Sequence, residues 1–129
     1  MNDNDKFEKW INVLKRLGDY DPSEVFDKRG KITDFNGKIK SSQDREVNLG
    51  VMFLPWRRSL GVNKINQVAR KSKSAGLDGA IIVTNKYSPA AEDQVNRINE
   101  VDNVKVVLFN TKELELISNA IREESSFQE

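Results

Sequence analysis

The apolar residues of this chain fall into short groups whose spacing changes along the sequence. Between residues 5 and 18 they recur every three or four positions, which is the spacing of an amphipathic helix that ends at Gly18. Continuous apolar runs at 47–54, 80–84 and 104–109 have the length of strands that are covered on both faces. The pattern therefore predicts an N-terminal helix and three buried strands.

Helical spacing returns between and after these strands. Residues 62–75 repeat apolar positions along one side, and Gly76 comes next as a typical helix end. A second helix is expected to begin after Ser88 and Pro89, because serine caps a helix well and proline suits its first position. Thr111 is expected to begin a third. The order strand–helix–strand–helix–strand–helix implies parallel crossovers, with helices packed against a sheet.

The first half adds a helix and a hairpin to this pattern. Asn36 and Gly37 lie between the short segments 31–36 and 38–42, and Asn-Gly favours a tight turn because both residues adopt positive φ. We therefore predict a single α/β domain, residues 1–122, with a mixed sheet and helices on both faces. The three buried strands are expected at its centre, and residues 123–129 as a charged, frayed tail.

Composition excludes several kinds of chemistry. The chain contains no Cys and no His, so it has no disulfide, no thiolate metal site and neither the commonest general base nor the usual zinc ligand. It has no glycine-rich phosphate loop, and no histidine to activate a serine nucleophile. No apolar run approaches the ~18 residues of a membrane span, and the acidic N-terminus is no signal peptide. We expect a cytoplasmic protein without a cofactor.

Charge is distributed unevenly along the sequence. Residues 1–46 hold ten acids and ten bases, residues 47–77 hold six bases and no acid, and residues 78–129 hold ten acids and five bases. An ordinary solvated helix face is one interpretation of the central segment, but the lack of a balancing acid favours contact with phosphates. Trp56, within the same segment, is expected to pack at a strand end more than to stack on bases. The six bases are Arg57, Arg58, Lys64, Arg70, Lys71 and Lys73.

One family pattern is visible in the second half. Residues 76–91 read Gly-Leu-Asp-Gly-Ala-Ile-Ile-Val-Thr-Asn-Lys-Tyr-Ser-Pro-Ala-Ala, preceded by Gly-Val-Asn-Lys-Ile-Asn-Gln-Val at 61–68 and followed by Val-Val-Leu-Phe-Asn-Thr-Lys-Glu-Leu at 106–114. This arrangement resembles the Mrr-like branch of the restriction-endonuclease-like superfamily. The resemblance covers residues 30–120 and implies the fold of those nucleases.

The expected catalytic strand departs from that family. Such nucleases need an acid on one strand, and an acid or amide with a lysine on the next, to hold Mg²⁺ and activate water. Residues 51–56 read Val-Met-Phe-Leu-Pro-Trp and lack the Glu-x-Lys or Gln-x-Lys pattern. Asp34, Asp44 and Glu46 are candidates for the first carboxylate, although solvated acids explain them as well. The sequence therefore favours a catalytically degenerate member that is not an enzyme and holds no metal.

Three functions are compatible with these observations. The first is a non-catalytic module that binds the backbone of DNA or RNA through the six bases. The second is a protein-interaction module of the transcription or DNA-processing machinery, since the acidic second half suits a basic partner and a second copy of the chain is a further candidate. Silent folds of this type occur in the jaw region of a eukaryotic RNA polymerase subunit and in an archaeal protein that contacts the TATA-binding protein. A metal-dependent nuclease with a rearranged site is third.

Overall fold

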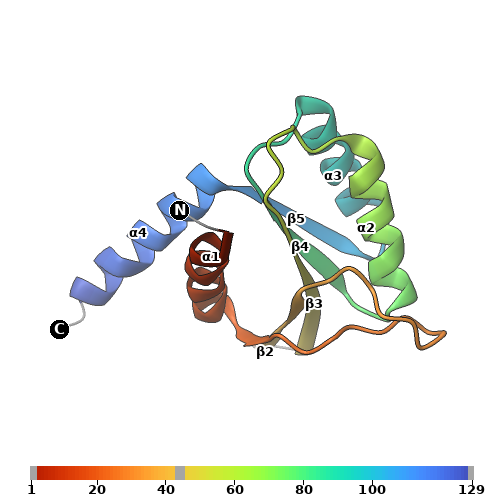
Figure 1. The fold of residues 1–129 in the computed structure, drawn as a ribbon, viewed down its shortest axis with the longest axis horizontal. Coiled ribbons are helices and arrows are strands. Elements are labelled where there is room, and N and C mark those ends of the chain that lie inside the picture. Colours follow the sequence, from red (N-terminus) through yellow and green to blue (C-terminus); the bar gives the residue numbers. More distant parts are fainter. Residues whose placement is uncertain (1–2, 43–45, 128–129) are drawn as a thin grey trace.

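The computed structural model describes residues 3–42 and 46–127, and the amphipathic N-terminal segment forms helix α1 (Asp3–Leu17) in it. Two short strands come next, β1 (Asp19–Asp21) and β2 (Gly37–Ser42), before strands and helices alternate (Figure 1). The remaining elements are β3 (Glu46–Leu54), α2 (Val62–Ser74), β4 (Gly79–Thr84), α3 (Pro89–Val101), β5 (Lys105–Asn110) and α4 (Thr111–Phe127).

The strands form one mixed sheet in the order β1-β2-β3-β4-β5. The pairs β1–β2 and β2–β3 are antiparallel, whereas β3–β4 and β4–β5 are parallel, as the helical crossovers require. This confirms the predicted α/β class and the order of the elements. The expectation that 104–109 is central was wrong. Within the described residues β5 is an edge strand, because it pairs with β4 alone and the chain then continues into α4.

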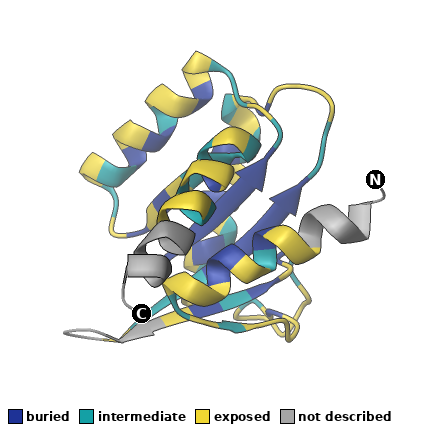
Figure 2. Ribbon diagram, turned by 90° about the vertical axis from the view of Figure 1, so that its left-hand side faces the viewer, coloured by how far each residue is buried: buried dark blue, intermediate teal, exposed yellow. Residues whose placement is uncertain are grey.

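Side chains from the two faces of the sheet form two cores. Met52 and Ile82 point towards α2 and α3, while Phe53 and Ile81 point towards α1 and α4. The ring centroids of Trp10 and Phe53 lie 5.5 Å apart in the second core. Figure 2 shows the buried strands between helices whose outer sides are exposed. The continuous apolar runs of the sequence are thus explained by strands with helices on both faces.

The prediction of a hairpin turn at Asn36 and Gly37 was also wrong. Asn36 instead extends the pairing with β3: its N–H donates to the carbonyl of Val51, and its Oδ1 accepts from the N–H of Phe53 at 2.8 Å. Gly37 begins β2, and its φ is not positive. Glycine is required there for space, since a Cβ would lie 2.5 Å from the carbonyl oxygen of Asp21. This glycine is therefore explained by the close packing of two strands and not by a turn.

The predicted helix ends are largely confirmed. The Ser88 hydroxyl accepts from the N–H of Ala91, so that serine caps α3, and Gly76 has φ 71° just after α2. α4 begins at Thr111 and continues to Phe127, and the fraying of residues 123–129 stays a prediction. None of the helices in the described part of the chain is long and apolar enough to cross a membrane.

Candidate nucleic-acid interface

The loop between β3 and α2 is fixed by backbone hydrogen bonds. Leu60 is fully buried; its N–H donates to the carbonyl of Lys86 and its carbonyl accepts from the N–H of Ser88. The Nδ2 group of Asn85 donates to the carbonyl of Trp56 at 2.9 Å. These contacts with the segment after β4 hold Trp56 and Arg58 beside the first turn of α2.

A hollow of ≈ 830 Å³ lies between this loop and α2. The half-buried Trp56 forms part of its wall, with the Arg58 guanidinium 4.5 Å and the Lys64 Nζ 5.7 Å from the ring centroid. Both cations are attracted by the aromatic face. Burial, and the charge of Lys71, lower the pKa of Lys64. The hollow is lined by Trp56, Arg58, Ser59, Gly61, Val62, Asn63, Lys64, Gln67 and Arg70.

The first turn of α2 adds backbone donors to this hollow. Gly61 precedes the helix without a side-chain cap, and the first turn contains no acidic residue. Its N–H groups have no partner within the helix, and the helix dipole places partial positive charge at the same end. Such an end favours anions, phosphate groups among them. Both the backbone and the side chains of this region therefore attract anions.

Four of the six predicted bases have no carboxylate within ion-pair distance among the described residues. We call them the open bases: Arg57, Arg58, Lys64 and Arg70. The three arginines are exposed, and the half-buried Lys64 donates to Oε1 of Gln67 at 3.1 Å. Of the four, all but Arg57 line the hollow. Their charge is available to an anion that approaches from solvent.

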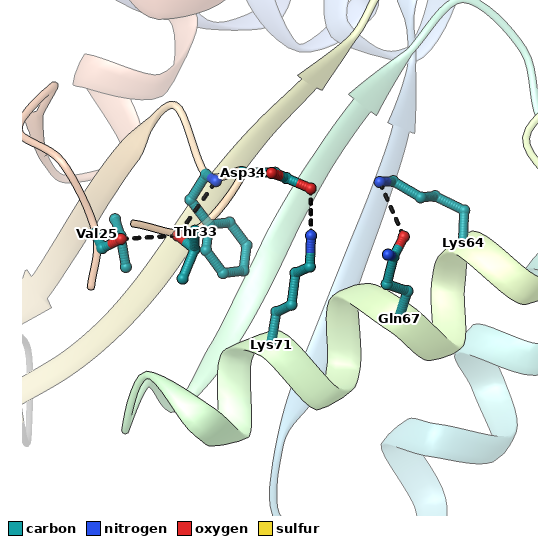
Figure 3. A network of polar contacts seen from close by, with 7 residues as sticks. Val25, Thr33, Asp34, Lys64, Gln67 and Lys71 are labelled. Carbon is teal, nitrogen blue, oxygen red and sulfur yellow. Dashed lines mark hydrogen bonds and ion pairs between the residues drawn. The ribbon is translucent and has the colours of Figure 1, made fainter. Parts of the chain in front are cut away.

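The other two, which we call the paired bases, are Lys71 and Lys73. Lys71 forms an ion pair with Asp34, which precedes β2 and reaches across to α2 (Figure 3). This hydrogen bond lowers the pKa of Asp34. Lys73 Nζ lies 3.0 Å from Oδ1 of Asp102 at the end of α3 and lowers the pKa of that carboxyl group. The predicted basic surface is therefore divided.

The candidate metal ligands do not converge. Asp34 pairs with Lys71 near the start of β2, while Glu46 lies at the opposite end of the β2–β3 pair and forms an ion pair with Lys40. Asp44 lies outside the described residues. In the part of the chain that the structure describes, no three acidic residues are grouped closely enough to hold a metal ion. On β3, Met52 and Leu54 are buried in the core beneath α2, where they leave no ligand for a metal.

The order of elements and the mixed sheet define a restriction-endonuclease-like fold. A solved structure, the DNA modification-dependent restriction endonuclease AspBHI, matches 93% of this chain with a TM-score of 0.60 and 19% sequence identity. The match covers 32% of the AspBHI chain, so this protein corresponds to about a third of that enzyme. Comparison with protein-family models and with curated protein sequences found no match. At this identity the likeness establishes the fold.

Proposed function

We propose that this chain is a nucleic-acid-binding module of nuclease-like fold that does not cleave its ligand. The open bases contact backbone phosphates of DNA or RNA, and the uncapped start of α2 contributes N–H donors. The observation that carries this proposal is the convergence of Arg58, Lys64 and Arg70 around one hollow, with no carboxylate of the described residues paired to them. Unpaired bases neutralise phosphates without first giving up a protein partner.

Charge reversal tests the proposal. The double variant Arg58→Glu/Arg70→Glu should weaken binding to a short DNA duplex at low salt by at least about tenfold, because two phosphate contacts become repulsive. Its matched control is Lys15→Glu/Lys112→Glu, with the same charge change on exposed residues of α1 and α4, which cover the other face of the sheet. Equal losses in both variants, measured by fluorescence anisotropy, would show only a response to net charge and would contradict the assignment.

The second part of the proposal is that the chain does not cleave nucleic acid. The resemblance to nucleases implies an acid and a lysine on β3, where this chain has buried apolar residues from Val51 to Leu54. We expect no cleavage of plasmid or branched DNA in Mg²⁺ or Mn²⁺. Cleavage that disappears in Asp34→Ala would overturn this claim and would place Asp34 in a rearranged nuclease site.

A protein-interaction module is the alternative function. Two large apolar side chains are highly exposed, Val101 at 85% and Leu116 at 68%, and β5 leaves an unpaired sheet edge within the described residues. This alternative predicts little nucleic-acid binding at physiological salt. It also predicts a defined protein that co-purifies with the chain and stays bound after nuclease treatment. A partner that nuclease treatment releases would instead support the nucleic-acid proposal.

A further inference from the structure

Residues 25–33, between β1 and β2, form a small hairpin that the sequence pattern did not predict. Phe26 and Ile32 face each other in an isolated antiparallel bridge, and the N–H of Asp27 donates to the carbonyl of Lys31 at 2.9 Å. The Asp27 carboxylate accepts from the N–H groups of Arg29 and Lys31 at 2.8 and 3.0 Å. These bonds fix the turn, so the hairpin presents its side chains on an ordered backbone.

The outer face of this hairpin is apolar. Val25 points into the core beneath α2, whereas the next residue, Phe26, is 50% exposed and its cross-strand neighbour Ile32 is 60% exposed. Directly opposite residues of an antiparallel pair project to the same side, so the two side chains form one patch. An exposed pair of this size on an ordered hairpin indicates a contact surface.

Basic residues surround the apolar pair. Lys28, Arg29 and Lys31 are exposed, and none of them forms an ion pair with another described residue. Asp27 is the one acid between Phe26 and Ile32, and its carboxylate is already engaged by backbone N–H groups. Bases beside an apolar patch complement an anionic polymer that also offers apolar edges, and duplex DNA has this combination.

The hairpin also lies beside α2, the helix that carries the open bases Lys64 and Arg70. The N–H of Lys28 donates to the carbonyl of Ser74 at the end of α2, and Asp34 just after the hairpin pairs with Lys71. Figure 1 shows this segment, in orange, passing the C-terminal end of α2 and projecting from the body of the domain. A ligand on α2 can therefore extend onto the hairpin without crossing the sheet.

We propose that this hairpin reads a groove of duplex DNA, which gives the module a sequence preference that phosphate contacts cannot provide. This inference rests on the proposed function and extends it. A two-stranded ribbon fits the major groove, where the thymine methyl group is the apolar feature of the base edges. Phe26 and Ile32 contact such methyl groups, and Lys28, Arg29 and Lys31 contact the flanking phosphates.

The test compares two A·T-rich duplexes of one sequence, one with thymine and one with uracil, which lacks the methyl group. Wild-type protein should bind the thymine duplex about fourfold more tightly for each methyl group contacted, the factor expected from burying one such group. Phe26→Ala/Ile32→Ala should lose this preference and bind the uracil duplex as the wild type does. Leu116→Ala, which truncates another exposed apolar side chain, should keep it. Thermal unfolding checks that each variant is folded.

Each result decides between the proposals. A double variant that binds both duplexes like the wild type, or weakens equally on both, overturns groove reading, and the patch is then available to a protein partner. In that case reduced binding by Arg58→Glu/Arg70→Glu still supports the proposed function. Wild-type protein that binds neither duplex at low salt overturns both proposals. Lys28→Gln/Arg29→Gln/Lys31→Gln should lower the salt dependence while it keeps the preference for thymine.

Discussion

The two groups of bases that the sequence places together differ in their surroundings. The open bases Arg58 and Lys64 lie against Trp56 and around a hollow, and no described carboxylate is within ion-pair distance of them. The paired bases, Lys71 and Lys73, are held by carboxylates from distant parts of the chain. An anion must displace a carboxylate to reach the paired bases, whereas the open bases are already available. Net charge along the sequence therefore overstates the charge that a ligand meets.

Neighbouring positions on α2 provide the largest expected contrast. Arg70 and Lys73 are both exposed and lie one helical turn apart, but only Lys73 has a carboxylate partner. Arg70→Gln should make the log–log slope of DNA affinity against salt shallower by about 0.9, the value for one lost phosphate contact. Lys73→Gln should change the slope by clearly less. Equal changes in two matched titrations would show that the pairing with Asp102 has no effect on binding.

Removal of an acid should have the opposite effect, because it frees a paired base and raises DNA affinity. Asp34→Asn leaves Lys71 without its carboxylate partner, so Lys71 becomes an open base. DNA affinity at low salt should then rise, and the slope should steepen by about 0.9. The control Asp21→Asn neutralises an exposed acid on β1 that has no ion pair among the described residues. A similar gain in that control would reduce the effect of Asp34 to a change in net charge.

The smallest expected effect concerns stability. Asp34, the carboxylate of the Lys71–Asp34 pair, is largely exposed, so Asp34→Asn should lower the free energy of unfolding by less than about 1 kcal/mol at neutral pH. Because Lys71 lowers the pKa of Asp34 in the folded state, this contribution is present above the ordinary value of 3.8. It is lost as the pH falls through the lowered folded pKa. Urea unfolding of both proteins between neutral and acidic pH checks this, and a difference that grows in acid would contradict it.

Sequence patterns predicted the elements that depend on local spacing. The buried runs, the helix start at Ser88 and the glycine after α2 all result from apolar period and capping, and the structure contains each of them. The edge position of β5 could not be predicted in this way, because it depends on which strands lie beside it in space. The Asn36–Gly37 error has the same origin. Contacts with β1 and β3 decided that conformation, and local turn preference did not.

Prediction of the candidate site was limited by distance along the chain. The bases on α2 were visible as a segment without acids, but their partners Asp34 and Asp102 lie 37 and 29 residues away from them. The hairpin at 25–33 could not be predicted for another reason. Its apolar residues are exposed, and they are too few to show the periodic spacing of a strand or helix. Phe26 and Ile32 could be recognised only once the fold showed that neither is buried.

The central claim is that the open bases bind nucleic acid through phosphates. Its most direct test is the affinity of the wild-type chain for a short DNA duplex, measured by filter binding over a series of salt concentrations. Neutralisation of about four phosphates, one for each open base, predicts a log–log slope of about −3.6, and the bases of the hairpin at 25–33 would steepen it further. A protein that does not bind the duplex even at low salt would contradict the claim, because bases that cannot hold DNA when unscreened are simply solvated.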